Sequence, residues 1–143
     1  RRFSQLWEIN ATREIPAVVE VGRRLATELA EPLPETVVHG DYRLGNLMVE
    51  RDRPDRVQAV LDWEMGAIGD PRADLGYLLA TYTEPGGGPS PLGVSPVTAL
   101  EGFPTKAELV ARYEERSGRE VGPLGWFEAS RVLHGEVGGE QLR

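Results

Sequence analysis

Apolar residues recur every three or four positions in four stretches of the chain, which is the spacing that lines one face of an α-helix. In the first stretch, Val18, Val21, Leu25 and Leu29 follow this spacing. Residues that favour helix starts and stops flank the other stretches. We therefore expect four helices, over residues 16–30, 71–82, 105–118 and 123–139.

The residues at the ends of these stretches set the expected bounds. Asp70 suits the capping position of the second helix, and Pro71 suits its first turn. Thr105 and Glu108 form a capping-box pattern at the start of the third helix, and Gly118 is placed to end it. These local signals agree with the apolar spacing, so the helices should form as predicted.

A different pattern, short and β-branched, lies between the first two helices. Residues 36–38 are an extended piece that enters a glycine-flanked loop. Residues 46–50 and 57–63 then have strand composition and are separated by the polar turn sequence RDRPDR. The simplest connection between these two strands is an antiparallel hairpin.

Residues 84–104 are rich in Gly and Pro and show neither helical nor strand-like spacing of apolar residues. A connection of this length is unusual inside a compact domain, and such loops tend to be binding loops or disordered. At 143 residues the whole chain has room for one domain. We expect residues 1–143 to form a single domain with this loop inside it.

Composition narrows the class of function. The formal net charge of −7 disfavours binding to nucleic acid or to an anionic membrane, which both require clustered positive charge. The chain has no cysteine, which excludes disulfides and thiolate chemistry and is compatible with the cytoplasm, where we expect it. No apolar run approaches the ~20 residues of a membrane span. Chemistry on a soluble small molecule is the better expectation.

The strongest candidate for chemistry is the segment HGDYRLGN, which contains His39, Asp41 and Asn46. A second acid, Asp62, follows the apolar strand of the predicted hairpin. Alone, an Asp and an Asn five residues apart would be an ordinary solvated loop. Together with Asp62 they supply a carboxylate that can accept a hydroxyl proton and hard oxygen ligands for magnesium, the groups that phosphoryl transfer needs.

At this point the sequence resembles a family. HGDYRLGN together with LDWEMGAIGDPRADLGYLL resembles the aminoglycoside phosphotransferase family, whose catalytic lobe is similar to that of protein kinases. The resemblance extends to GFPTKAELVARYEERSGR and back to RRFSQLWE, and it is strongest to the branch associated with acyl-CoA dehydrogenases. It implies an α+β, mostly helical fold: the C-terminal lobe of a kinase-like enzyme, with a small β-hairpin.

The resemblance also implies roles for the polar residues. Asp41 would be the catalytic base, and Arg43 would offset charge on the transferring phosphate, although a plain surface arginine is the alternative. Asn46 and Asp62 would bind the cofactors, by holding the Mg²⁺ ion on the phosphates of ATP. The acceptor would be a small-molecule hydroxyl.

Two further residues would support this loop. By the same resemblance, His39 would brace it through backbone hydrogen bonds, the alternative being a packed core histidine, and Asp74 would hydrogen-bond it from beneath. Trp63 would pack under the metal site, where protein kinases carry Phe. Glu64, two residues beyond Asp62, is a candidate to reach a magnesium-bound water.

The chain departs from the family pattern in one respect. A complete kinase-like enzyme has an N-terminal lobe with a glycine-rich strand and a lysine that holds the nucleotide phosphates. The only lysine here is Lys106, well after the candidate loop, and the sequence does not begin with Met. We expect that the N-terminal lobe is missing and that the chain is part of a larger enzyme.

Two alternatives to a phosphotransferase stay open. The chain could be a non-catalytic fragment or binding module that is inactive without the N-terminal lobe. It could also be a metal-dependent hydrolase that uses Asp41, Asp62 and Glu64 around one or two cations. The sequence does not identify the acceptor: aminoglycosides, choline-like alcohols, sugars and hydroxyacyl thioesters all remain open.

Overall fold

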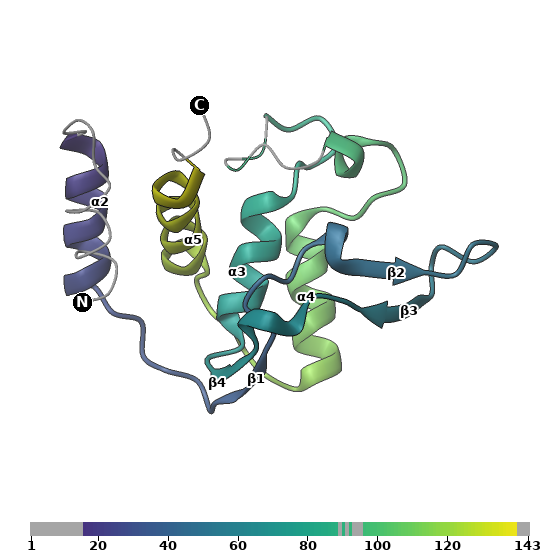
Figure 1. The fold of residues 1–143 in the computed structure, drawn as a ribbon, viewed down its shortest axis with the longest axis horizontal. Helices are drawn as coiled ribbons and strands as arrows, with labels where there is room; N and C mark the ends of the chain where they lie inside the picture. The colour runs from purple at the N-terminus through teal and green to yellow at the C-terminus, as the bar shows by residue number, and fades with distance from the viewer. Residues whose placement is uncertain (1–15, 89, 91, 93–95, 140–143) are drawn as a thin grey trace.

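The computed structural model describes residues 16–88, 90, 92 and 96–139. Within them the chain folds into helices and short strands (Figure 1). The helices are α2 (Pro16–Thr27), α3 (Arg72–Thr81), α4 (Lys106–Ser117) and α5 (Gly125–Gly139). The strands are β1 (Thr36–Val38), β2 (Leu47–Val49), β3 (Val57–Val60) and β4 (Ala67–Gly69). The predicted α+β, mostly helical composition is confirmed.

All four predicted helices are present, with small differences at their ends. Helix α2 ends at Thr27, because the sequence that follows leads into Pro32 and Pro34. Helix α5 begins at Gly125 rather than at Pro123, since the carbonyl of Leu124 accepts the N–H of Glu128 as an early helical hydrogen bond. The predicted capping box of α4 is confirmed, and a left-handed Gly118 caps its end.

The strands form two separate two-stranded sheets, where one hairpin was predicted. The hairpin of β2 and β3 is confirmed, with Leu47 opposite Val60 and an irregular register between Met48 and Val49. The second sheet pairs β1 with β4 antiparallel, so that Val37 lies opposite Ile68. Figure 1 shows the β2–β3 hairpin projecting on the side of the molecule opposite α2.

The hydrophobic core lies between α3 and α5. Five residues form its buried cluster: Leu75, Leu79, Val121, Leu124 and Phe127. The two helices approach closely at Gly76, where an added Cβ would lie 2.5 Å from the Cβ of Phe127. Helix α3 is therefore held rigidly against the rest of the molecule, which matters because it supports the candidate site.

The start of α3 is tied to the chain that leads into β1. Helix α3 begins at Arg72 with Pro71 as its N-cap residue, one residue later than predicted. Asp70 accepts the backbone N–H of Arg72 at 2.9 Å and that of Leu33 at 3.1 Å. The guanidinium of Arg72 binds the same carboxylate and the carbonyl of Glu31. Asp70 thus joins the start of α3 to the segment that leads into β1 and the candidate loop.

The Gly/Pro-rich segment 84–104 is anchored where the structure describes it. Ser90 is buried and its hydroxyl donates to the carbonyl of Ala80 at 2.6 Å. The N–H of Thr83 donates to Thr98 Oγ1 at 2.9 Å, and a short 3₁₀ turn spans Pro96–Ala99. Residues 89, 91 and 93–95 of this loop lie outside the described residues. No helix in the described part of the chain is long and apolar enough to cross a membrane.

Candidate active site

The loop that contains the predicted site is supported from beneath by α3. Asp74, in the first turn of α3, accepts the backbone N–H of His39 at 2.6 Å and that of Gly40 at 2.8 Å, with a different carboxylate oxygen for each. Two charge-assisted hydrogen bonds to consecutive peptide groups fix the direction in which the chain leaves β1. The position of the next residue, Asp41, is set by this contact.

Gly40 permits this geometry. Its φ of +85° is a backbone conformation that residues with a Cβ seldom adopt. A Cβ at this position would also lie 2.6 Å from the carbonyl oxygen of Met65. The loop therefore passes close under the Trp63–Met65 turn because glycine stands at position 40.

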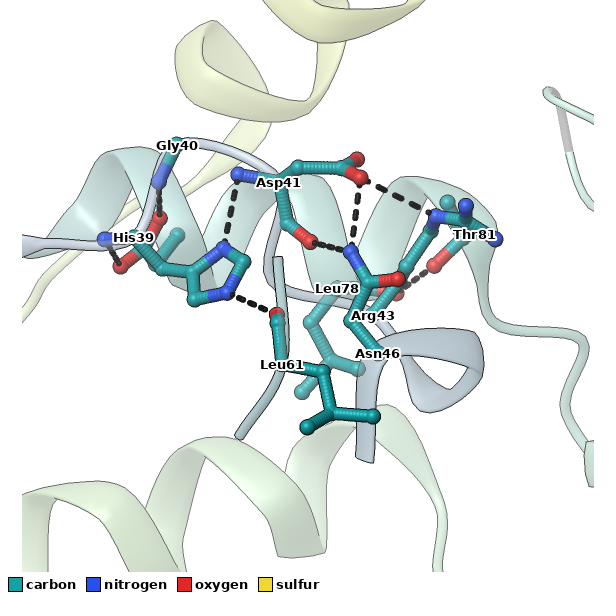
Figure 2. A network of polar contacts seen from close by, with 9 residues as sticks. His39, Gly40, Asp41, Arg43, Asn46, Leu61, Leu78 and Thr81 are labelled. Atoms are coloured by element: carbon teal, nitrogen blue, oxygen red, sulfur yellow. Dashed lines mark hydrogen bonds and ion pairs between the residues drawn. The ribbon is translucent and has the colours of Figure 1, made fainter. Parts of the chain in front are cut away.

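His39 joins the loop to the end of β3. Its ring is almost fully buried, and its Nε2 lies 2.7 Å from the carbonyl oxygen of Leu61 (Figure 2). Since the N–H of Asp41 donates to Nδ1 at 3.2 Å, the tautomer that satisfies both contacts carries its hydrogen on Nε2. The ring of Trp63 packs on that of His39, with centroids 4.7 Å apart. Trp63 thus lies against His39, and its packing under a metal site stays a prediction.

The carboxylate of Asp41 is held by neighbours from its own loop. The amide nitrogen of the buried Asn46 donates to Asp41 Oδ2 at 2.7 Å and to the Asp41 carbonyl at 2.8 Å (Figure 2). Arg43 Nε lies 3.4 Å from Oδ2. Because the nitrogen of Asn46 is committed to Asp41, the amide oxygen is the atom that can bind a cation.

Tyr77 of α3 acts on the pKa of Asp41, an influence that sequence reasoning missed. Burial raises the pKa of Asp41, but hydrogen bonds from Tyr77 and Asn46 and the charge of Arg43 outweigh it and lower the pKa below its usual value. Asp41 is therefore a carboxylate at neutral pH. The signal that could have found Tyr77 is its place three residues after Asp74 on a predicted helix, which puts both on one face.

Asp62 lies at a strained point of the backbone directly after the hairpin. Its φ of 66° and ψ of 59° are left-handed, and among the described residues no other non-glycine residue has a positive φ. Its neighbour Leu61 donates its N–H to the carbonyl of Asn46 at 2.8 Å and binds His39 through its own carbonyl. The fold thus brings Asp62 next to the loop of Asp41 and Asn46. Such strain often accompanies functional sites.

The donor set fits one particular kind of metal site. The carboxylate of Asp62 and the amide oxygen of Asn46 are hard ligands of the kind that Mg²⁺ prefers. The described residues contain no group of three or more His, Cys, Asp or Glu side chains that could hold a metal ion. The Asn46 amide oxygen and the Asp62 carboxylate are therefore the atoms that would hold such an ion.

Comparison with known families agrees with this geometry. The sequence model described as "Phosphotransferase enzyme family" matches residues 2–127, which contain every residue of the site. The chain belongs to this family. The resemblance to the phosphotransferase family that the sequence motifs indicated is thereby confirmed.

Two relatives are acyl-CoA dehydrogenase family members, as the sequence resemblance implied. Member 10 of Mus musculus is 38% identical over 104 residues, which cover 71% of this chain and 10% of that protein. Member 11 of Rattus norvegicus is 33% identical over 129 residues, or 87% of this chain and 16% of that protein. The phosphotransferase-family chain therefore spans a small part of the length of these relatives.

A solved structure extends the likeness to the fold. The crystal structure of a protein from Ralstonia eutropha JMP134, assigned as an aminoglycoside phosphotransferase, superimposes with a TM-score of 0.73 at 29% sequence identity. The match covers 94% of this chain and 42% of that one. The phosphotransferase-family chain thus has the fold of part of an aminoglycoside phosphotransferase structure.

Proposed function

We propose that this chain is the catalytic half of an ATP- and magnesium-dependent phosphotransferase whose acceptor is the hydroxyl of a small molecule. The observation that carries the proposal is the arrangement around Asp41. An ionised carboxylate is bound by the amide of Asn46, and Leu61 joins that same asparagine to Asp62. The base and the metal ligands thus come from two segments of the sequence, the candidate loop and the residue that follows the hairpin.

The proposed reaction assigns each residue a task. Asp41 orients the acceptor hydroxyl and accepts its proton, while the acceptor oxygen bonds to the γ-phosphorus and the bond from that phosphorus to the bridging oxygen of ADP breaks. Arg43, whose side chain is about one-third exposed beside Asp41, offsets negative charge on the phosphoryl group. The Asn46 amide oxygen and the Asp62 carboxylate hold Mg²⁺. When bound, the ion neutralises charge on the phosphates.

The nucleotide needs a partner lobe in this proposal. Lys106, the single lysine of the chain, binds Glu128 at 3.3 Å at the start of α4, so it is engaged away from Asp41. Meanwhile large apolar side chains lie exposed around the site, among them Trp63 and Met65 of the turn after Asp62. Exposed apolar surface of this kind marks a contact with another body. We infer that an N-terminal kinase lobe supplies the grip on the phosphates and covers this surface.

Replacing the base in the full-length protein tests the function. Asp41→Ala should lower transfer of the labelled γ-phosphate from ATP by about 10²- to 10⁴-fold, since that is what a positioned base contributes. The acceptor panel contains an aminoglycoside, choline, a sugar and a hydroxyacyl thioester. Asp55→Ala, which removes an exposed aspartate paired with Arg53 in the hairpin turn, is the matched control and should retain activity. Full turnover by Asp41→Ala would remove the proposal.

The same assay separates transfer from hydrolysis. The hydrolase alternative would use Asp41, Asp62 and Glu64 as metal ligands, but no three such side chains gather at a potential metal site within the described residues. A hydrolase would also leave the contacts of Asn46 with Asp41 without a catalytic purpose. Label that appears in an organic product supports a phosphotransferase, whereas label that appears only as inorganic phosphate supports the hydrolase.

A further inference from the structure

The side chain of Arg43 lies over the glycine two residues after it. A Cβ added at Gly45 would lie 2.7 Å from Nη1 of Arg43 and 3.5 Å from its Cζ. Non-bonded heavy atoms settle at about 3.5 to 4.0 Å, so an alanine at position 45 and the guanidinium cannot both occupy this space. The guanidinium therefore rests on the loop where another residue would have its side chain.

The same guanidinium reaches the carboxylate of Asp41. Arg43 Nε lies 3.4 Å from Asp41 Oδ2, the oxygen that also accepts the side-chain amide of Asn46 at 2.7 Å (Figure 2). The contact of the arginine is at the long end of the hydrogen-bond range, so a small shift away from Asp41 breaks it. Asn46 holds the carboxylate independently of Arg43. The position of the arginine is thus the sensitive part of this group.

The surroundings of Arg43 decide where a displaced guanidinium can go. Arg43 lines a cavity of about 20 Å³ together with residues from the end of α3 and from segment 84–104, namely Leu78, Thr81, Tyr82 and Thr98. The last three of these are buried. A space of this size holds about one water molecule and is too small for a guanidinium. Since the side chain of Arg43 is 32% exposed, the open direction is toward solvent.

The backbone at position 45 does not itself require glycine. Gly45 lies in the short 3₁₀ turn Leu44–Asn46 and, unlike Gly40, does not have a positive φ. Apart from its chain neighbours, the only atoms of the described residues within 4 Å of an added Cβ belong to Arg43. An alanine at this position should therefore displace the arginine and leave the fold intact.

We propose that Gly45 is a positioning residue: its missing side chain lets the guanidinium of Arg43 lie against the loop beside Asp41, where a larger residue would turn it toward solvent. This proposal rests on the proposed function, in which Arg43 offsets negative charge on the phosphoryl group. A charge contributes most to catalysis when it is in place before the transition state forms. Gly45 thus decides whether Arg43 serves the reaction or is a plain surface arginine.

Kinetics of the full-length protein test the positioning role. Gly45→Ala should lower kcat about tenfold with little change in the KM of the acceptor found by the panel, because the charge is displaced from the transition state. Arg43→Ala removes the charge and should lower kcat by about 10²-fold. Gly125→Ala is the matched control: it lies at the start of α5, with no atom of the described residues within 4 Å of the added Cβ. It should keep the wild-type kcat, and an unchanged kcat in Gly45→Ala would overturn the proposal.

A double variant decides whether Gly45 acts through Arg43. Added to Arg43→Ala, the change Gly45→Ala should cause no further loss of kcat, since no guanidinium is left to displace. A full additional loss would show that Gly45 acts on the reaction by another route. That result would overturn the proposal even if the single variant loses activity.

The pH profile gives a readout that a purely structural role would not move. Burial raises the pKa of Asp41, and Tyr77 of α3 together with Asn46 and Arg43 of the loop lowers it below its usual value. Displacing the arginine should let this pKa rise, so the acid limb of kcat should move to higher pH in Gly45→Ala, as it should in Arg43→Ala. A limb that moves in Arg43→Ala but not in Gly45→Ala would overturn the proposal.

NMR of the 143-residue chain tests the contact without turnover. With ¹⁵N in the arginine side chains, the Nε–H resonance of Arg43, assigned by its loss in Arg43→Lys, should shift in Gly45→Ala and stay in place in Gly125→Ala. The midpoint of thermal unfolding of Gly45→Ala should be no lower than that of the wild type. An unchanged Arg43 resonance would overturn the proposal. A shifted resonance without transfer by the wild-type protein to any acceptor would instead count against the proposed function.

Discussion

Gly40 determines whether the candidate loop can follow its path. Two separate demands meet at this residue: a left-handed backbone with φ +85°, and a distance of 2.6 Å between the place of an added Cβ and the Met65 carbonyl. The first demand is a matter of conformation, and the second is a steric clash with backbone that has little freedom to move. The two contributions can be measured apart.

Gly40→Ala should destabilise the chain by about 2 to 4 kcal/mol, the sum of left-handed strain and a forced shift of the Trp63–Met65 turn. Gly118→Ala is the control: it has a similar φ of +67° with no atom near the added Cβ, so it should cost only about 1 kcal/mol. Urea denaturation of both variants measures the difference. Equal losses would mean that the close approach at Gly40 carries no cost.

The spacing of single residues predicted much of the site, and its limits are physical. The motif predicted that His39, Asp41 and Asn46 lie on one loop, and the predicted hairpin brought Asp62 close to that loop. Their chemical roles stay predictions. The influence of Tyr77 on the pKa of Asp41 was missed because a tyrosine on a helix face is usually core, and because it depends on how α3 packs under the loop. The left-handed backbone of Asp62 was likewise invisible, since it arises from the turn that follows the hairpin.

Among the elements, α3 depends on the ion pair at its start. The side chains of Arg72 and Asp70 are 7% and 18% exposed, so the pair is largely removed from water. Burial raises the pKa of Asp70, but hydrogen bonds from the Arg72 side chain and from the N–H groups of Arg72 and Leu33 outweigh it and lower the pKa. The folded state therefore favours the charged carboxylate.

Asp70→Asn should lower the free energy of unfolding by about 2 to 3 kcal/mol at pH 7, because it leaves the buried Arg72 without its counter-charge. The partial exposure of position 70 to water reduces this loss. A carboxyl whose pKa is lowered by folding stabilises the protein above its unfolded pKa of about 4, and this stabilisation is lost as pH falls through the lower, folded value. The cost of the substitution should thus shrink in acid.

Urea denaturation at pH 7 and at the lowest pH at which the chain stays folded checks this dependence. Asp55→Asn, in the exposed pair with Arg53, serves as the control and should change stability by no more than about 0.5 kcal/mol at either pH. A cost of Asp70→Asn that does not change with pH would contradict the assigned charge pairing.

The elements differed in how well the sequence predicted them. Helices α2 to α5 were found because their apolar spacing spans several turns and is supported by caps such as Thr105. Strand β4 was missed, since Ala67–Gly69 has three residues, ends in glycine and lies directly before a helix signal. Its pairing with β1 depends on a partner about thirty residues away, which no local pattern reports.

At the scale of the whole molecule, large apolar side chains are exposed on the segments that flank the candidate loop. They come from the turn after Asp62 and from both small sheets. All are at least 43% exposed: Val37, Met48, Val49, Val57, Leu61, Trp63, Met65 and Ile68. A lobe docked on this surface would cover the apolar side chains and enclose the space above Asp41 and Asp62. Docking of such a lobe would thus link the exposed apolar side chains to the site.

Titration of the 143-residue chain with Mg-ATP tests this arrangement. The chain alone has candidate metal ligands but no lysine placed to hold the nucleotide phosphates. It should therefore bind Mg-ATP with a dissociation constant above about 1 mM, which corresponds to a binding free energy of less than about 4 kcal/mol. The full-length protein should bind more tightly in the same calorimeter. Tight binding and turnover by the 143 residues alone would refute the need for a second lobe. Weak binding by both proteins would instead favour the non-catalytic alternative.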